Sequence, residues 1–200
     1  MERLNLRRNP FGELTPEEQL ALAVVDLQDW PAWLLAGPRR ALLLVGPPGR
    51  GKTTHLRALA AEVPAAVWAR PEEQDGACDP APPGALLCLD DAQRLAPRAL
   101  LRVTDPARGL ALCDHGERGR ALRGAGWEVR ACRLEAPGSA QLCELVRRRI
   151  EAVRRAAGPV PHLGEPAAAA LLEACAGDVR AVLDRLYWRV QEATHAGALA

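Results

Sequence analysis

The octapeptide Gly46–Thr53 constrains the fold more than any other feature of this 200-residue chain, because it fits the pattern G-x-x-x-x-G-K-[ST] at every fixed position. An apolar run, Arg40–Val45, precedes it, and a helical pattern, Lys52–Ala61, follows it. Glycines let such a loop curl until its backbone N–H groups converge, and the dipole of the following helix favours an anion there. The segment therefore predicts a strand, a phosphate-binding loop and a helix, in that order.

The side chains of this loop suit a nucleoside triphosphate and a magnesium ion. Lys52 is expected to reach the β- and γ-phosphates, and the Thr53 hydroxyl to bind Mg²⁺. Lys52 is the one lysine among 26 basic residues, so the chain places a compact ammonium where phosphate binding needs it. Thr54 is expected to pack or to assist nearby. The predicted nucleotide-binding residues are Gly46, Pro47, Pro48, Gly49, Arg50, Gly51, Lys52, Thr53 and Thr54.

Another apolar run, Ala85–Leu89, ends in two carboxylates, Asp90 and Asp91. A strand that ends in an acidic residue commonly completes such a site, so Asp90 is expected to hold Mg²⁺ with Thr53. Asp91 lies where many such ATPases carry the Glu that activates the attacking water. Aspartate is one methylene shorter, which draws the base back by about 1.5 Å, and a misplacement of about 1 Å can already matter for the rate.

The remaining motifs favour adenine over guanine. Guanine-specific proteins with this loop usually carry an N-K-x-D motif, but Asn5 and Asn9 are the only two asparagines and both precede the loop. Lys52 is the sole lysine, so the motif is absent, and ATP with Mg²⁺ is the predicted ligand. No motif for a second small-molecule substrate is visible, which makes a small-molecule kinase the least favoured alternative.

Short apolar runs alternate with helical patterns over the first two thirds of the chain. Strands are expected at Arg40–Val45, Ala65–Ala69, Ala85–Leu89, Gly109–Cys113 and Trp127–Leu134. Helices are expected at Pro16–Asp29, Pro31–Ala36, Lys52–Ala61, Pro97–Val103, Glu117–Arg123, Ser139–Ala157, Glu165–Ala176 and Asp178–Thr194. This alternation predicts an α/β fold with a parallel five-stranded sheet flanked by helices. We expect a core of residues 1–137, with an N-terminal helical segment at 14–36, and a C-terminal helical lid of residues 138–200.

Composition excludes several classes of protein. The formal net charge is +1, so no general basic field indicates nucleic acid, and DNA binding would need a local patch. Charges at the N-terminus without an apolar run argue against a secretory signal, and no apolar stretch is long enough to span a bilayer, so a cytoplasmic location without a membrane partner is expected. The six cysteines show no metal-ligand spacing and are interpreted as small, mostly buried thiols.

Three segments together resemble the AAA+ ATPases. They are L-L-V-G-P-P-G-R-G-K-T-T-H-L, then L-L-C-L-D-D-A-Q-R-L, then G-D-V-R at residues 177–180. The D-D-A-Q-R-L segment is similar to the D-E-A-Q of transposition-helper and secretion-pathway ATPases. The resemblance extends from about Asn9 to about Val190, and it implies an ATPase that works as a homo-oligomer.

The resemblance also implies further catalytic residues. A polar sensor at the end of the fourth strand corresponds to Asp114 or His115, and a sensor arginine in the lid corresponds to Arg180. Gly177 can end one helix and Asp178 can cap the next, which puts Arg180 in a first helical turn from which it could reach a γ-phosphate.

Other basic residues have two interpretations each. An arginine finger for a neighbouring subunit would come from Arg118, Arg120 or Arg123, which are otherwise solvated side chains. The group Arg147, Arg148, Arg149, Arg154 and Arg155 forms either a solvated face or a DNA patch.

Asn9-Pro10-Phe11 resembles a segment that lines the adenine pocket in some family members, but a plain apolar anchor is an equal alternative.

Two functions fit these features. The first is a Mg²⁺-dependent ATPase that couples its nucleotide state to assembly or to a grip on a partner, either an unidentified protein or DNA. The alternative is a nucleotide-dependent binding switch with slow or no hydrolysis, which the aspartate at position 91 favours.

Overall fold

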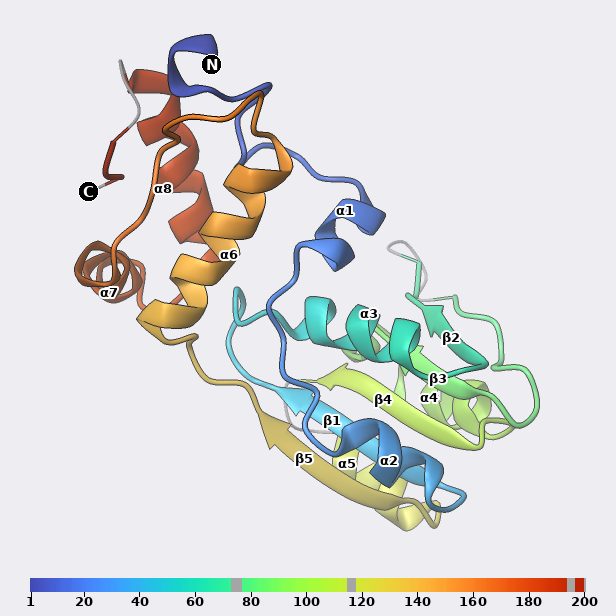
Figure 1. Ribbon diagram of the computed structural model, residues 1–200. Coiled ribbons are helices and arrows are strands. Elements are labelled where there is room, and N and C mark those ends of the chain that lie inside the picture. Colours follow the sequence, from blue (N-terminus) through green and yellow to red (C-terminus); the bar gives the residue numbers. More distant parts are fainter. Residues whose placement is uncertain (73–76, 115–117, 194–196, 200) are drawn as a thin grey trace. The chain divides into compact units, whose positions relative to one another are not determined.

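The computed structural model contains the parallel five-stranded sheet that the sequence predicts (Figure 1). The strands are β1 Arg40–Val45, β2 Ala66–Ala69, β3 Leu86–Leu89, β4 Gly109–Asp114 and β5 Glu128–Arg133, in the order β2-β3-β4-β1-β5. Strand β4 therefore lies between β1 and β3, with Val45 paired to Asp114 and Leu89 to Leu112. Because parallel strands end at the same edge, the loop after β1, Asp90 and Asp114 come together there.

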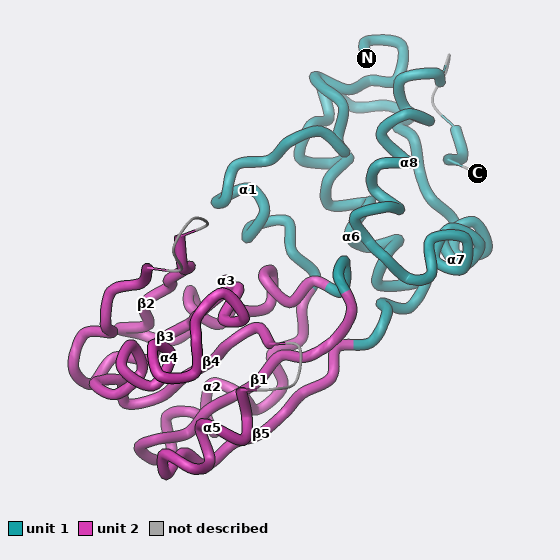
Figure 2. Tube along the Cα trace, turned by 180° about the vertical axis from the view of Figure 1, so that it is seen from behind, with its two compact units in different colours: residues 1–24, 48–50, 135–200 teal, residues 25–47, 51–134 magenta. Residues whose placement is uncertain are grey.

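The structure describes residues 1–72, 77–114, 118–193 and 197–199. Its contacts divide the chain into two units (Figure 2). Unit 1 comprises residues 1–24, 48–50 and 135–200, and unit 2 comprises residues 25–47 and 51–134. The expected division into 1–137 and 138–200 differs from this mainly at the N-terminus, because residues 1–24 pack with the C-terminal helices.

Unit 2 has an apolar layer on each face of the sheet, and alternate strand residues supply them. Leu42 and Leu44 pack with α2 (Trp30–Leu35) and α3 (Lys52–Glu62), whereas Leu43 packs with α4 (Pro97–Thr104) and α5 (Arg118–Gly124). Successive side chains of a strand point to opposite faces, so a strand covered on both faces is apolar throughout. This explains the continuous apolar run in β1.

Unit 1 is helical and includes the N-terminal segment (Figure 1). Its helices are α1 Pro16–Ala21, α6 Ser139–Ala152, α7 Glu165–Ala174 and α8 Val179–Glu192, with a short 3-10 helix, η1, at Glu2–Leu4. Leu4, Leu6 and Phe11 are buried in the same cluster as residues of α6, α7 and α8. The side-chain amide of Asn9 donates to the Tyr187 carbonyl oxygen at 3.0 Å, which fixes this segment on α8.

Two predicted helices were too long. Helix α1 ends at Ala21 rather than Asp29, and the carbonyl oxygens of Ala23 and Val24 accept hydrogen bonds from the side chains of Arg148 and Gln141. Helix α6 ends at Ala152 rather than Ala157. Just after it, Arg154 forms an antiparallel bridge with Leu6 instead of continuing the helix. Partners distant in sequence replaced the helical hydrogen bonds in both places. In the described ranges, no helix has the length and apolarity that crossing a membrane requires.

The packing of Phe11 generates a stability prediction. Phe11→Ala should destabilise unit 1 by about 3–5 kcal/mol, because it leaves a cavity in the cluster that α6, α7 and α8 share. Hydrogen exchange measured peptide by peptide should show faster exchange in α6 and α8 and unchanged exchange in α3.

Trp188→Ala serves as the control, because this side chain is 63% exposed and its loss should change exchange little. Unchanged protection of α6 and α8 in the Phe11 variant would show that the N-terminal segment is not part of this core.

Candidate functional site

The loop after β1 has the backbone geometry of an anion site. Gly46 has φ of 148°, and a Cβ atom there would lie 2.9 Å from the Leu134 carbonyl oxygen, so the position excludes a side chain. Gly51, with φ of 78°, precedes α3, and no side chain caps the helix in the described part of the chain. By contrast, Asp178 caps α8 through the N–H groups of Arg180 and Ala181. The first-turn N–H groups of α3 therefore remain available to phosphate oxygens.

Lys52 is held over this loop. Its Nζ donates to the carbonyl oxygens of Gly46 at 2.7 Å and of Pro47 at 2.8 Å. Thr54 lies half-buried in the first turn of α3. The ammonium group therefore donates to neutral carbonyl oxygens here. Phosphate oxygens carry more negative charge and would replace these acceptors.

Thr53 and Asp90 form the expected pair. The Thr53 Oγ1 lies 3.2 Å from Oδ1 and 3.0 Å from Oδ2 of Asp90, and the Asp90 carboxylate is buried. Magnesium in nucleotide sites is held by one or two protein oxygens together with phosphates. The Thr53 hydroxyl and the Asp90 carboxylate supply two such oxygens. Within the described ranges no cluster of three metal-ligating side chains exists.

Cys113 packs beside this carboxylate. Burial raises the pKa of the Cys113 thiol, and the negative charge of Asp90 raises it further. The thiol therefore stays protonated and is a neutral neighbour for Asp90. Sequence reasoning treated this residue only as a small core side chain, and its place beside Asp90 depends on the strand order.

Asp91 is engaged by two arginines. Its Oδ2 accepts from Arg70 Nε at 2.9 Å and Nη2 at 2.5 Å, and Arg94 Nη2 lies 3.3 Å from the same oxygen. Gln93 donates to Oδ1 at 3.0 Å. Burial raises the pKa of the Asp91 carboxyl, but the bonds from Arg70 and Gln93 and the two guanidinium charges outweigh burial, so the pKa lies below its usual 3.8. A carboxylate held in this way is a weak base.

Sequence reasoning missed Arg70. This residue follows β2 and Asp91 lies shortly after β3, and the two strands are neighbours with Ala69 paired to Leu89. Only the sheet order places the guanidinium beside the carboxylate.

Asp114 ends β4 and is fully buried. Its Oδ2 accepts from the backbone N–H of Arg118 at 2.9 Å, whereas its buried Oδ1 has no partner among the described residues. A buried carboxylate oxygen without a donor is costly, so this atom suits a water molecule or another donor. His115, the other candidate for the polar sensor, lies outside the described residues.

The candidate finger arginines differ in their surroundings. Arg118 Nη2 donates to the carbonyl oxygens of Gln93 and Leu95, both at 2.9 Å, so it ties α5 to η2, the short 3-10 helix Ala92–Arg94. Arg120 and Arg123 are exposed. Arg118 is less exposed than these two.

His55 connects the start of α3 to α2. Its Nδ1 lies 2.9 Å from the Gly51 carbonyl oxygen, and its ring centroid lies 5.9 Å from that of Trp30. Burial lowers the pKa of His55, although the bond to the Gly51 carbonyl opposes the shift. A neutral imidazole with its proton on Nδ1 accounts for this contact.

Several predicted residues belong to unit 1. Arg50 Nη2 donates to the Ala176 carbonyl oxygen at 2.7 Å, and the Gly49 carbonyl oxygen accepts from the Val179 N–H at 3.2 Å. Pro48 is assigned to the same unit. Arg180 is exposed in the first turn of α8, as expected from the Asp178 cap.

The N-terminal motif serves as an apolar anchor in the core of unit 1, since Phe11 is buried there. This contact corresponds to one of the two alternatives for Asn9-Pro10-Phe11.

The basic residues on α6 and just after it are largely neutralised. Glu144 pairs with Arg147 and Arg148, Glu151 pairs with Arg154, and Glu2 pairs with Arg155. These ion pairs favour a solvated face over a DNA patch.

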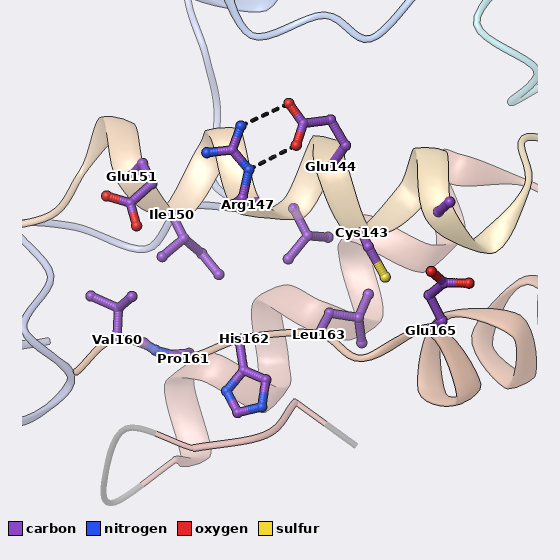
Figure 3. A pocket seen from close by; sticks show the side chains of 12 residues that line it. Cys143, Glu144, Arg147, Ile150, Glu151, Val160, Pro161, His162, Leu163 and Glu165 are labelled. Carbon is purple, nitrogen blue, oxygen red and sulfur yellow. Dashed lines mark hydrogen bonds and ion pairs between the residues drawn. The ribbon is translucent and has the colours of Figure 1, made fainter.

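Unit 1 also contains a cavity of about 360 Å³ beside α6 (Figure 3). Val146, Ile150 and Leu163 supply apolar lining, and Glu144 and Arg147, which pair with each other, also line it. None of the residues predicted to bind the nucleotide or Mg²⁺ lines it.

Comparison with known proteins shows the fold. No protein-family model matches the chain, and no curated protein matches it. It is similar to Cdc6p from Pyrobaculum aerophilum, with 19% identity, a TM-score of 0.50, and coverage of 91% of this chain and 64% of that one. It is also similar to Drosophila ORC bound to DNA, with 16% identity, a TM-score of 0.48, and coverage of 95% and 58%. The chain thus spans less than two thirds of either neighbour. The likeness to Cdc6p supports the α/β fold described above, a parallel five-stranded sheet flanked by helices.

Proposed function

We propose that the chain binds ATP with Mg²⁺ at Gly46–Thr53 and hydrolyses it, at a rate that Asp91 and its arginine partners restrain. The observation that carries this proposal is the Thr53–Asp90 pair beside an α3 N-terminus that no side chain caps in the described residues. An uncapped helix start attracts phosphate, and a hydroxyl with a carboxylate attracts magnesium.

Each residue has a distinct part in this proposal. The N–H groups of the loop and Lys52 bind the β- and γ-phosphates, and Thr53 and Asp90 hold Mg²⁺. The ion, when bound, offsets negative charge on the phosphates. Asp91 accepts the proton of the attacking water, and Asp114 orients that water through its Oδ1, which has no partner in the described part of the chain.

The engaged state of Asp91 favours the second candidate function. A carboxylate bound by Arg70, Arg94 and Gln93 is badly placed to accept a proton. A protein in this state would act as a nucleotide-dependent binding switch with slow or no hydrolysis. Hydrolysis then requires Arg70 to move away from Asp91.

We also propose that the chain assembles with further copies of itself and binds a partner. A homo-oligomer would let Arg120 or Arg123 of one copy reach the nucleotide of the next, and an unidentified protein or DNA would respond to the nucleotide state. The D-D-A-Q-R-L segment supports a relationship to the transposition-helper and secretion-pathway ATPases within the AAA+ group.

Lys52→Ala tests the nucleotide site. The variant should bind ATP at least about tenfold more weakly in a calorimetric titration, because charge-assisted bonds to phosphate contribute about 1.5–3 kcal/mol each. Arg57→Ala removes a cation from the same helix, over the Trp68 ring, and should leave ATP affinity nearly unchanged. Equal ATP affinity in the Lys52 variant and the parent would refute the proposed site.

The Arg70–Asp91 contact separates the two candidate functions. Asp91→Asn should keep ATP binding and stop phosphate release. Arg70→Ala should raise kcat severalfold, because it frees the carboxylate and increases its basicity. Removal of the guanidinium raises the pKa of Asp91, so the acid-side fall of kcat should move to higher pH in this variant.

The Arg70→Ala, Asp91→Asn double variant is the control and should be as inactive as Asp91→Asn. Asp91→Asn activity at the parental rate would show that Asp91 is not the base. No phosphate release from the parent or from Arg70→Ala, with and without DNA, would leave the binding switch as the function.

Arg180→Ala tests the lid arginine. A charge-assisted bond to the γ-phosphate is worth about 1.5–3 kcal/mol, so ATP binding should weaken very roughly tenfold to a hundredfold while ADP binding stays nearly unchanged. Arg185→Ala, an exposed arginine on the same helix, should affect neither. Equal losses for ATP and ADP would remove the γ-phosphate role.

A further inference from the structure

Ten of the 25 arginines in this chain are ion-paired in the described residues. Carboxylates within 4 Å hold Arg8, Arg39, Arg40, Arg70, Arg94, Arg130, Arg147, Arg148, Arg154 and Arg155. A face where several exposed arginines lie together without carboxylates therefore stands out from the rest of the molecule.

Such a face exists on α4 and α5. Arg98 and Arg102 of α4 lie one turn apart, and Arg120 and Arg123 lie three residues apart on α5, so each pair shares a helix side. All four are exposed, and none has a hydrogen-bond or ion-pair partner among the described residues. Neither helix contains an acidic residue. We call these four residues the α4–α5 basic surface.

The two helices hold these arginines on one side of unit 2. Leu100 and Val103 of α4 and Leu122 of α5 are buried in one apolar cluster with the sheet. The helices also contact each other, and the tube view shows both in unit 2 (Figure 2). Asp105, which follows α4, is paired with Arg39 at 3.0 Å and leaves the positive charge of the surface in place.

We propose that the α4–α5 basic surface binds the phosphate backbone of a nucleic-acid duplex. Four guanidinium groups without carboxylate partners suit phosphate oxygens, which arginine binds through paired N–H donors. A protein–nucleic acid interface is polar and strongly positive, which matches two helices whose charged residues are all arginine.

The same observations disfavour a protein partner at this surface. Protein interfaces are anchored by buried aromatic and large apolar residues. The exposed large apolar side chains in the described part of the chain are Leu35, Trp68 and Trp188, and none belongs to α4 or α5. Helix α8 differs, because the exposed Trp188 there lies among residues of both charges.

Fluorescence anisotropy with a labelled DNA duplex of about 30 base pairs tests the proposal, with an RNA duplex of the same sequence as the second arm. The parent should bind with an affinity that falls steeply between about 50 and 200 mM salt. Binding to both duplexes would identify the phosphate backbone that DNA and RNA share as the ligand. Preference for one duplex would identify which nucleic acid supplies it. No binding to either at low salt would overturn the proposal.

Two double variants locate the surface. R98Q/R102Q and R120Q/R123Q should each weaken duplex binding by roughly tenfold and lower the salt slope by about 1.8, because each lost phosphate contact changes the slope by about 0.9. R3Q/R185Q removes the same charge from exposed arginines of unit 1 and should leave binding nearly unchanged. An equal loss in this control would show a net-charge effect and refute the surface.

Further measurements test whether a duplex is the ligand of this surface. ATP affinity and circular dichroism of R98Q/R102Q should match the parent, so failure of the duplex proposal is distinguishable from failure of the nucleotide site. Competition by polyglutamate as effective as that by duplex would identify an acidic protein partner instead and overturn the proposal. A loss of ATP turnover in R120Q/R123Q without a loss of duplex binding would assign α5 to subunit contacts and also overturn it.

Discussion

Strand β1 is hydrogen-bonded on both sides along its whole length, and the rest of unit 2 depends on this double pairing. Arg40–Val45 pairs with Gly109–Asp114 on one side and with Glu128–Arg133 on the other. The backbone of β1 therefore needs no water, and its leucines can be fully buried on both faces. The same pairing fixes the start of the loop, since the Leu134 carbonyl after β5 lies where a side chain at Gly46 would be.

Features that a few neighbouring residues determine could be predicted from the sequence. The strand, loop and helix around Lys52, the carboxylates after β3 and the Asp178 cap all depend on local chemistry, and the structure has each of them. The five-stranded parallel sheet also followed from local patterns, but its order did not. Cys113 reaches Asp90 because β4 pairs with β3, and Arg70 reaches Asp91 because β2 pairs with β3. No local pattern indicates these contacts. The place of residues 1–24 in unit 1 likewise depends on distant apolar partners.

The chain uses arginine for tasks that differ in their charge requirements. Arg118 and Arg148 donate to backbone carbonyl oxygens, where the several N–H groups of a guanidinium satisfy acceptors that secondary structure leaves open. Arg70 neutralises the Asp91 carboxylate, which the proposed ATP hydrolysis would need free. A count of basic residues cannot separate these uses, since the formal charge is the same in each. Only the partners of each side chain show which positive charges remain available to a ligand.

The single lysine has a chemical consequence of its own. Acylation, glycation and isopeptide conjugation of lysine all take place at the side-chain amine, and Lys52 carries the only one in the sequence. Its Nζ is hydrogen-bonded to the Gly46 and Pro47 carbonyl oxygens within the loop. A reagent that modifies lysine therefore has one target, and that target is the residue on which the proposed phosphate binding depends. Acylation of this chain at a lysine and loss of the loop's ammonium charge are, for this sequence, one and the same event.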